Sequence, residues 1–187
     1  MGATVSRRQM VAGLAAVSVI PLMRMVSAAT VSGPASNSEV SIENFSPAGK
    51  SLGVERVSKL AKSDAEWKAQ LSPLAYRVAR QAGTEIAFTG EYDRNHADGI
   101  YHCVCCDTAL YDSKTKFESG TGWPSFWQPI SALNILKSGD KTFGMERDAI
   151  SCRRCDAHLG HVFDDGPKPT GLRYCMNSVA LHFTARP

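Results

Sequence analysis

The sequence predicts an antiparallel β domain preceded by two short helices. Helix-capping signals cluster between residues 63 and 83, whereas short β-prone runs separated by Gly, Asp and Pro turn residues occupy the chain from Ile86 onward. No segment after Gly83 has the length and periodicity of a helix. The clearest β-prone runs are Gly99–Val104, Thr142–Met145, Leu159–Phe163 and Leu172–Phe183.

Both helices are predicted from their first residues. Ser63 and Glu66 are spaced as a capping box, which predicts a short helix through Leu71. The dipeptide Ser72-Pro73 supplies a cap and a first-turn proline for a second helix that ends near Gly83.

The first 29 residues have the order of an export signal. Arg7 and Arg8 form a twin-arginine pattern, followed by an uncharged run and the small residues 27–29. We therefore expect residues 1–29 to be a twin-arginine signal peptide that directs the protein to the bacterial periplasm, with an uncleaved membrane anchor as the alternative. Residues 30–53, rich in Ser, Gly, Pro and Asn, are expected to form a flexible linker, and residues 54–187 the folded domain.

The charge balance argues against a nucleic-acid partner. The 187 residues contain 21 basic and 18 acidic side chains, but residues 1–29 contribute three arginines and no acid. The remaining chain therefore has 18 of each, and it lacks the excess positive charge that nucleic-acid binding requires.

Two C-x-x-C pairs predict a metal site. Each pair is followed by Asp-x-x-Leu, so the chain repeats one local pattern, with Asp107 and Asp156 at the turn position after the second cysteine. Two such knuckles make one tetrahedral four-cysteine site for a single structural Zn²⁺, with the ligands Cys103, Cys106, Cys152 and Cys155. Disulfides are the alternative, because six cysteines in an exported chain would suit three bridges.

Cys175 is an isolated cysteine in the β-prone run Leu172–Phe183. Side chains alternate faces along a strand, so Arg173, Cys175 and Asn177 are expected to share one side. A neighbouring guanidinium favours the thiolate, which is the nucleophilic form of cysteine. The alternative is an inert, buried thiol.

Two histidines and an aromatic loop add to this site. His158 and His161 would reach the same region if Gly160 made the strand irregular, because a regular strand puts them on opposite faces. Asp164 or Asp165 could orient an imidazole, although Asp-Asp-Gly-Pro is equally a turn. The segment 117–127 is too aromatic for a solvated loop and is expected to line a binding site.

Several motifs together resemble the B-type methionine-R-sulfoxide reductases, over roughly residues 65–183. They are Gly-Thr-Glu at 83–85, Phe-Thr-Gly-Glu-Tyr at 88–92, Gly-Ile-Tyr-His-Cys-Val-Cys-Cys at 99–106, Ser-Gly-Thr-Gly-Trp-Pro-Ser-Phe at 119–126, Ala-His-Leu-Gly-His-Val-Phe-Asp-Asp-Gly-Pro at 157–167 and Gly-Leu-Arg-Tyr-Cys-Met-Asn-Ser at 171–178.

The resemblance implies two antiparallel sheets, a structural zinc distant from the site, and a catalytic domain at 54–187. It makes Cys175 the nucleophile that attacks the sulfoxide sulfur and places Trp123 on the substrate methyl group. The expected catalytic residues are Cys175, His158, His161, Arg173, Asp165 and Asn177, and the expected substrate-binding residues are Trp123 and Phe163.

The implied reaction reduces the R epimer of methionine sulfoxide in oxidised proteins or peptides and leaves a sulfenic acid on Cys175. Many family members carry a second, resolving cysteine where this chain has Thr121. We therefore expect recycling by an external thiol, either a small thiol or a thioredoxin-like or glutaredoxin-like protein, with the enzyme acting as a monomer. The competing hypothesis is a zinc-stabilised ligand-binding module in which Cys175 is inert.

Overall fold

The computed structural model describes residues 1–2, 38–140 and 147–187 of the chain. Apart from Met1 and Gly2, the predicted signal peptide lies outside the described residues, as do residues 30–37 of the predicted linker and the β-prone run Thr142–Met145. Among the described residues, no helix is long and apolar enough to cross a membrane.

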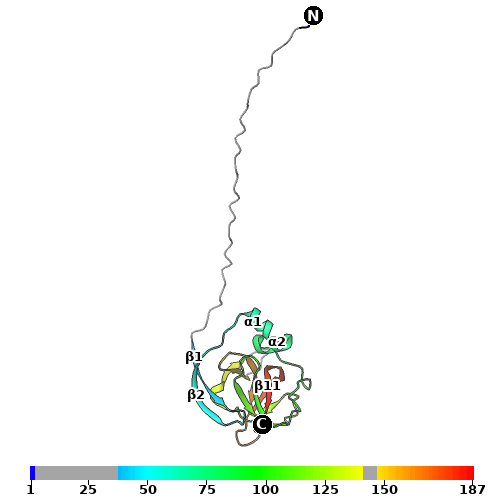
Figure 1. The fold of residues 1–187 in the computed structure, drawn as a ribbon. Helices are drawn as coiled ribbons and strands as arrows, with labels where there is room; N and C mark the ends of the chain where they lie inside the picture. The colour runs from blue at the N-terminus through cyan, green and yellow to red at the C-terminus, as the bar shows by residue number, and fades with distance from the viewer. Residues whose placement is uncertain (3–37, 141–146) are drawn as a thin grey trace. The chain divides into compact units, whose positions relative to one another are not determined.

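Both predicted helices are present near the start of the domain (Figure 1). Helix α1 (Asp64–Gln70) begins with the expected capping box, in which Ser63 Oγ accepts from the Glu66 amide and the Glu66 carboxylate accepts from the Ser63 amide. Helix α2 (Pro73–Gln81) has Pro73 in its first turn and Ser72 as its cap. The helices bury apolar side chains such as Trp67 and Val78 against the β domain.

The body of the domain consists of two antiparallel sheets, as predicted. The six-stranded sheet has the order β5 (Lys116–Phe117), β6 (Ser125–Phe126), β10 (Arg173–Met176), β9 (His158–Phe163), β8 (Arg147–Cys152) and β7 (Ile135–Asp140). The three-stranded sheet has the order β11 (Leu181–Ala185), β3 (Gly99–Cys103) and β4 (Ala109–Asp112). Short 3₁₀ turns η1 (Ser113–Thr115), η2 (Ala132–Asn134) and η4 (Ser178–Ala180) connect strands.

Aromatic packing joins the two sheets. Phe126 of the six-stranded sheet stacks on Tyr111 of the three-stranded sheet, with ring centroids 4.4 Å apart, and meets Tyr101 edge-on at 5.0 Å. The Tyr111 hydroxyl donates to the sulfur of Met176, 3.1 Å away. Because Met176 follows Cys175, this buried contact fixes the strand that carries the isolated thiol.

The predicted linker requires a correction over residues 39–53. Strands β1 (Glu39–Phe45) and β2 (Ser51–Ser58) form an antiparallel hairpin at one side of the domain (Figure 1). Ile42 is buried, and Asn134 exchanges two hydrogen bonds of 2.8 Å with the backbone of Glu43. Composition missed this hairpin because one apolar anchor and backbone pairing, rather than many large side chains, hold it in place.

The single strand expected at 172–183 is also wrong, because the chain divides there between the two sheets. Strand β10 ends at Met176, the turn η4 follows, and β11 belongs to the other sheet. The buried carboxylate of Glu85 causes the break, since it accepts the amides of Ser178 and Val179 at 2.6 and 3.0 Å. Those amides are then directed to a side chain instead of a neighbouring strand.

The irregularity expected at Gly160 is present in β9. The register passes from Ile150 opposite Gly160 to Ser151 opposite His158, so Leu159 is the extra residue of a bulge. A β-carbon on Gly160 would lie 2.1 Å from the Cys175 carbonyl oxygen, which only glycine avoids. The bulge brings the rings of His158 and His161 together, with centroids 5.2 Å apart.

Candidate functional site

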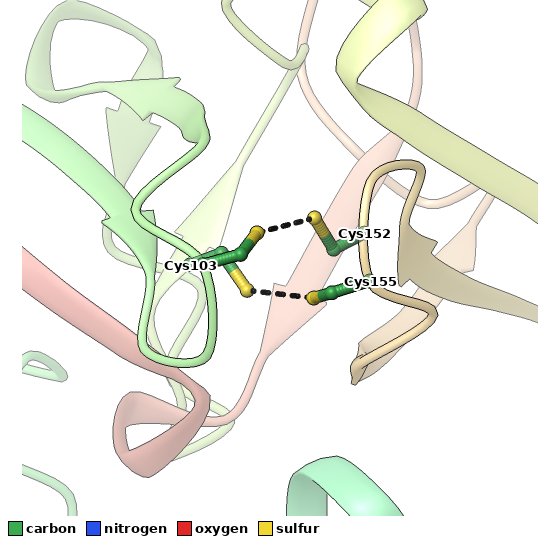
Figure 2. A group of neighbouring side chains, drawn as sticks. Cys103, Cys152 and Cys155 are labelled. Atoms are coloured by element: carbon green, nitrogen blue, oxygen red, sulfur yellow. Dashed lines mark hydrogen bonds between the residues drawn. The ribbon is translucent and has the colours of Figure 1, made fainter. Parts of the chain in front are cut away.

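The four paired cysteines form one cluster between two matching knuckles. Their sulfur atoms all lie within 4.8 Å of one another, and Figure 2 shows Cys152 and Cys155 on one loop facing Cys103 on the other. Between the two knuckles, the Sγ–Sγ distance is 3.6 Å from Cys103 to Cys155 and 3.5 Å from Cys106 to Cys152.

Each knuckle has the turn that the sequence predicted. Asp107 and Asp156 have φ of 63° and 57°, the left-handed conformation that Asp tolerates better than most residues. The amide of each aspartate donates 2.9 Å to the carbonyl of the first cysteine, Cys103 or Cys152. Equal backbone geometry in two distant segments therefore explains the repeated Cys-x-x-Cys-Asp pattern.

Other elements hold both knuckles in place. Gln70 of α1 donates to the Cys105 carbonyl at 2.9 Å, and Arg80 of α2 donates to the Cys155 carbonyl at 2.7 Å. The thiol of Cys105 is buried beside the cluster, as expected of a small hydrophobe. The helices therefore fix the separation of the two sulfur pairs.

The cluster fits a metal ion better than disulfides. All six cysteines are free, and the sulfurs are too far apart for a bond of about 2.05 Å. Four thiolates around a tetrahedral zinc with bonds of about 2.3 Å would be separated by about 3.8 Å, close to the spacing here. Hydrogen bonds with neighbouring thiols, Cys105 first, raise the pKa of Cys103, whereas a hydrogen bond with Cys103 lowers the pKa of Cys106. The four cysteines can therefore hold one ion.

Cys175 lies in a different part of the six-stranded sheet, between the neighbouring strands β6 and β9. Its direct partners are Ser125 on β6 and His161 on β9. Side chains of directly paired residues project from the same face, so this register places an imidazole and a hydroxyl beside the thiol.

An open pocket surrounds the Cys175 thiol. Trp123 and Phe163 supply its aromatic walls, and the indole nitrogen of Trp123 donates to the Glu85 carbonyl at 3.2 Å. The other lining residues are Thr84, Gly160, His161, Met176 and Asn177. His158 is not among them; it is buried, and its ring lies edge-on to that of His161, with centroids 5.2 Å apart.

Arg173 and Asp165 form one unit beside the pocket. The guanidinium makes two parallel hydrogen bonds of 2.8 Å to the Asp165 carboxylate and lies 4.3 Å from the ring centroid of Phe163. These hydrogen bonds raise the pKa of Arg173 and lower the pKa of Asp165. Because both carboxylate oxygens contact Arg173, Asp165 orients the guanidinium.

Burial opposes the activation of the Cys175 thiol that the neighbouring guanidinium was expected to supply. Burial raises the pKa of the Cys175 thiol above its ordinary value. The hydroxyl of Thr121 and the charge of Arg173 act in the opposite direction, but burial is the larger effect. The sequence indicated that a guanidinium lies near the thiol, but the extent to which the thiol is buried depends on the tertiary structure.

A hydroxyl network beside Cys175 was not identified from the sequence. Thr121 Oγ1 lies 3.8 Å from Cys175 Sγ and 2.8 Å from Ser119 Oγ, which in turn lies 2.7 Å from Ser125 Oγ. Gly122 has φ of 86° and folds the loop so that its carbonyl accepts the Phe88 amide at 2.8 Å. Ser119 and Ser125 belong to the aromatic-loop motif that the sequence showed. The sequence did not show that this hydroxyl network reaches the Cys175 thiol.

Glu85 and Asn177 hold in place the backbone that carries the pocket. Asn177 Oδ1 accepts the Glu85 amide at 2.9 Å, and its Nδ2 donates to the Leu159 carbonyl at 3.0 Å. Asn177 follows the end of β10 and lines the pocket together with Cys175 and Met176. Glu85 is buried and was missed as a positioning residue, although it belongs to the Gly-Thr-Glu motif.

The geometry defines a β domain with a cluster of four sulfurs suited to a metal ion and, in the six-stranded sheet, a thiol paired with an imidazole in an aromatic pocket. That arrangement is typical of proteins that use cysteine in redox chemistry.

Comparison with known proteins agrees with this class. The family model described as the SelR domain matches residues 71–185. Similar proteins named peptide methionine sulfoxide reductase MsrB occur in Pseudomonas entomophila strain L48, 52% identical, and Pseudomonas syringae pv. syringae strain B728a, 54% identical. Each of these matches spans 70% of this chain and 99% of the relative. An MsrB of Thioalkalivibrio sulfidiphilus strain HL-EbGR7 is 56% identical over 66% of this chain and 90% of the relative. The chain therefore belongs to the SelR domain family, together with these MsrB enzymes.

If the cysteine cluster holds a metal ion, loss of one ligand should release the ion and destabilise the fold at the same time. Changing Cys152 to Ser removes one ligand of four, so we expect release of zinc and a loss of several kcal/mol in the free energy of unfolding. Elemental analysis and urea unfolding measure the two effects. The matched control is Cys175→Ser, which lies outside the cluster and should retain one zinc per chain. Disulfides within both pairs and no zinc in the wild-type protein would contradict the assignment.

The raised pKa of Cys175 predicts slow alkylation of the native protein at neutral pH. Since burial disfavours the thiolate, the rate should increase with pH and reach its midpoint above the ordinary cysteine value of 9.0. Arg173→Gln removes a favourable charge and should move that midpoint higher still. Iodoacetamide labelling of Cys175, quantified by mass spectrometry at each pH, measures both, with the urea-unfolded chain as the control. A midpoint below that of the unfolded chain would restore the activated-thiolate hypothesis.

Proposed function

We propose that this protein reduces the R epimer of methionine sulfoxide in oxidised proteins or peptides. The observation that carries the proposal is the position of Cys175 Sγ in an open pocket with Trp123 as one wall and His161 directly across the strand pair. The names of its relatives, which refer to peptide methionine sulfoxide, support the same substrate class.

The pocket suits a methyl sulfoxide. An apolar indole can contact the methyl group, while the sulfoxide oxygen requires a hydrogen-bond donor on another side. With the methyl group and the oxygen fixed in this way, only one arrangement of the four substituents on the sulfur presents it to Cys175. The pocket is therefore proposed to select the epimer through the placement of Trp123 relative to the thiol.

The first chemical step transfers oxygen from the substrate sulfur to the Cys175 sulfur. The thiolate attacks the electrophilic sulfur while the sulfoxide oxygen accepts a proton, and the products are the methionine thioether and a Cys175 sulfenic acid. Since burial raises the pKa of Cys175, the thiol brings its own proton to the reaction. His161 is proposed to move that proton from the sulfur toward the sulfoxide oxygen, with His158 packed behind it.

The surrounding groups are proposed to stabilise the thiolate as it forms. Arg173, oriented by Asp165, supplies positive charge. Thr121 supplies a hydroxyl 3.8 Å from Sγ, positioned by Ser119, which in turn is hydrogen-bonded to Ser125. Asn177 and Glu85 hold the backbone that carries the pocket, so they are positioning residues.

Recycling is proposed to use external thiols. One thiol attacks the sulfenic acid and releases water, which leaves a mixed disulfide on Cys175, and a second thiol regenerates Cys175 and departs as the oxidised reductant. The reductant is a small thiol or a thioredoxin-like or glutaredoxin-like protein. Among the described residues, Thr121 rather than a cysteine lies next to Cys175, and Cys105 lies with the metal cluster.

The ion proposed for the cysteine cluster is zinc, held by Cys103, Cys106, Cys152 and Cys155. When bound, it supplies folding free energy and no step of the reaction, because four thiolates leave no open position for substrate.

The proposal predicts epimer-specific turnover that depends on Cys175. Peptides with separated R and S methionine sulfoxide, assayed with dithiothreitol, should show reduction of the R epimer alone. Cys175→Ser should lower that rate by at least about 10³-fold, since it removes the nucleophile. Cys105→Ser is the matched control and should keep activity. Equal turnover of the two epimers, or an active Cys175→Ser protein, would sink the proposal in favour of a zinc-stabilised binding module with an inert Cys175.

The presence of Thr121 beside Cys175 predicts a one-cysteine cycle, and a single substitution should convert it to a two-cysteine cycle. The Oγ1 of Thr121 lies 3.8 Å from Cys175 Sγ, so Thr121→Cys places a second thiol within reach of the sulfenic acid. We expect an intramolecular disulfide after one turnover and a severalfold gain with a dithiol protein reductant relative to monothiols. Mass spectrometry of the oxidised protein decides it, with Thr121→Ser as the control. A Cys105–Cys175 disulfide in the oxidised wild-type protein would overturn the one-cysteine cycle.

We also propose export to the bacterial periplasm through the twin-arginine pathway, supported by the order of residues within 1–29. Changing Arg7 and Arg8 to Lys should keep the precursor in the cytoplasm, which cell fractionation measures. Unchanged export, or a precursor retained in the membrane, would point to another route or to an uncleaved anchor.

A further inference from the structure

Two histidines form a cross-strand pair on the three-stranded sheet, away from the Cys175 pocket. His102 on β3 is paired directly with His182 on β11. Their rings are stacked, with centroids 5.0 Å apart and planes inclined by 28°. Directly paired residues project from the same face, so two imidazoles are presented side by side.

The first knuckle adds a carboxylate to this pair. Asp107 Oδ1 lies 3.1 Å from His182 Nε2 and 3.5 Å from His102 Nδ1. The backbone places the carboxylate there, because Asp107 has φ of 63° and its amide donates to the Cys103 carbonyl. One potential ligand atom from each of the three residues lies within 4.8 Å of the others.

These distances match the spacing of donors around a small transition-metal ion. Ligand atoms about 2.0–2.2 Å from an ion are about 3.0–3.5 Å apart when the angles between them are tetrahedral or octahedral. Two imidazole nitrogens and one carboxylate oxygen are suitable donors for Zn²⁺ and for Co²⁺, Ni²⁺ and Cu²⁺. The two oxygen–nitrogen distances therefore suit a shared ion, and the two nitrogens, which lie within 4.8 Å of each other, would close around it.

The three side chains are accessible from solvent. His102 is 18% exposed, His182 42% and Asp107 76%, so an ion can enter and the remaining coordination positions stay open to water. This distinguishes the group from the four buried or half-buried cysteines, which enclose an ion completely.

Hydrogen bonding offers the competing explanation for the same geometry. His102 Nδ1 lies 3.1 Å from the Asp107 carbonyl oxygen, so a proton on that nitrogen could bind there. A metal ion must replace that proton, and the two explanations therefore differ in whether added metal binds.

We propose that His102, Asp107 and His182 form a second, solvent-facing binding site for a divalent transition-metal ion of the zinc class, separate from the four-cysteine site and from the reductase pocket. The site goes beyond the proposed function, since neither the sulfoxide chemistry nor the cysteine cluster uses these histidines.

Metal titration of the full chain tests the site. Protein dialysed until it retains one zinc per chain is titrated with Zn²⁺ by calorimetry, and with Co²⁺ by absorption spectroscopy. We expect one further equivalent to bind. The added Co²⁺ should lack the thiolate-to-metal absorption of a cysteine site, because its protein ligands are nitrogen and oxygen atoms.

Two variants locate the second ion. His182→Ala removes an imidazole, and Asp107→Asn removes the carboxylate charge while keeping a residue that tolerates the left-handed backbone. Each should weaken the second equivalent at least about tenfold and keep the first zinc. If Asp107→Asn disturbs the knuckle and loses the first zinc, His182→Ala decides alone.

His96→Ala is the matched control, because exposed His96 lies 3.7 Å from Glu118 without a second imidazole in that ion pair. It should leave the second equivalent unchanged. Absence of a second equivalent in the wild-type protein, its persistence in His182→Ala, or its loss in His96→Ala would each overturn the proposal. Reductase activity with separated epimers is measured independently, so failure of this site leaves the proposed reaction intact.

Discussion

The convergence of the two knuckles on one cluster of four sulfurs is the constraint on which the other parts of the structure depend. The first knuckle connects β3 to β4 in the three-stranded sheet, and the second connects β8 to β9 in the six-stranded sheet. The cluster therefore connects the two sheets at the loops where these two segments of the chain reverse direction (Figure 2). Gln70 and Arg80 attach the helices to the same loops, so every layer of the domain meets there. A metal ion bound between segments so far apart in the chain would stabilise the fold by closing a long loop.

Strand β9 connects the second knuckle of the cysteine cluster to the pocket. It begins three residues after Cys155, and its bulge at Leu159 and Gly160 turns His161 toward Cys175. On the other side of β10, the stacked rings of Tyr111 and Phe126 and the hydrogen bond to Met176 fix the strand that carries the thiol. A thiol in the middle of a sheet has little freedom to move, which suits the proposed reaction, in which two epimers of one sulfur atom must be distinguished.

The electrostatics of the pocket balance burial against nearby donors. Burial keeps the Cys175 proton in place, while Arg173, Thr121 and Ser125 each favour its loss. A thiol of this kind resists oxidation by solvent oxidants more than an exposed thiolate does. Asp165 limits the effect of Arg173, because it shares the guanidinium through two hydrogen bonds. Burial and the nearby donors thus act on the pKa of the Cys175 thiol in opposite directions, and burial has the larger effect.

The sequence by itself determined the local features of this protein. The capping box at Ser63 and the repeated Cys-x-x-Cys-Asp turns each depend on neighbours within a few residues, and the structure contains both. Sequence motifs also predicted the cysteines of the metal cluster and the family. Contacts between distant segments were decided only by the tertiary structure. Examples are the hairpin at 39–58, the break after Met176, the Arg173–Asp165 pair, the hydroxyls near Cys175 and the burial that raises its pKa. The physical reason is that burial and long-range hydrogen bonding depend on which strands become neighbours, and a sequence pattern of period two does not specify that choice.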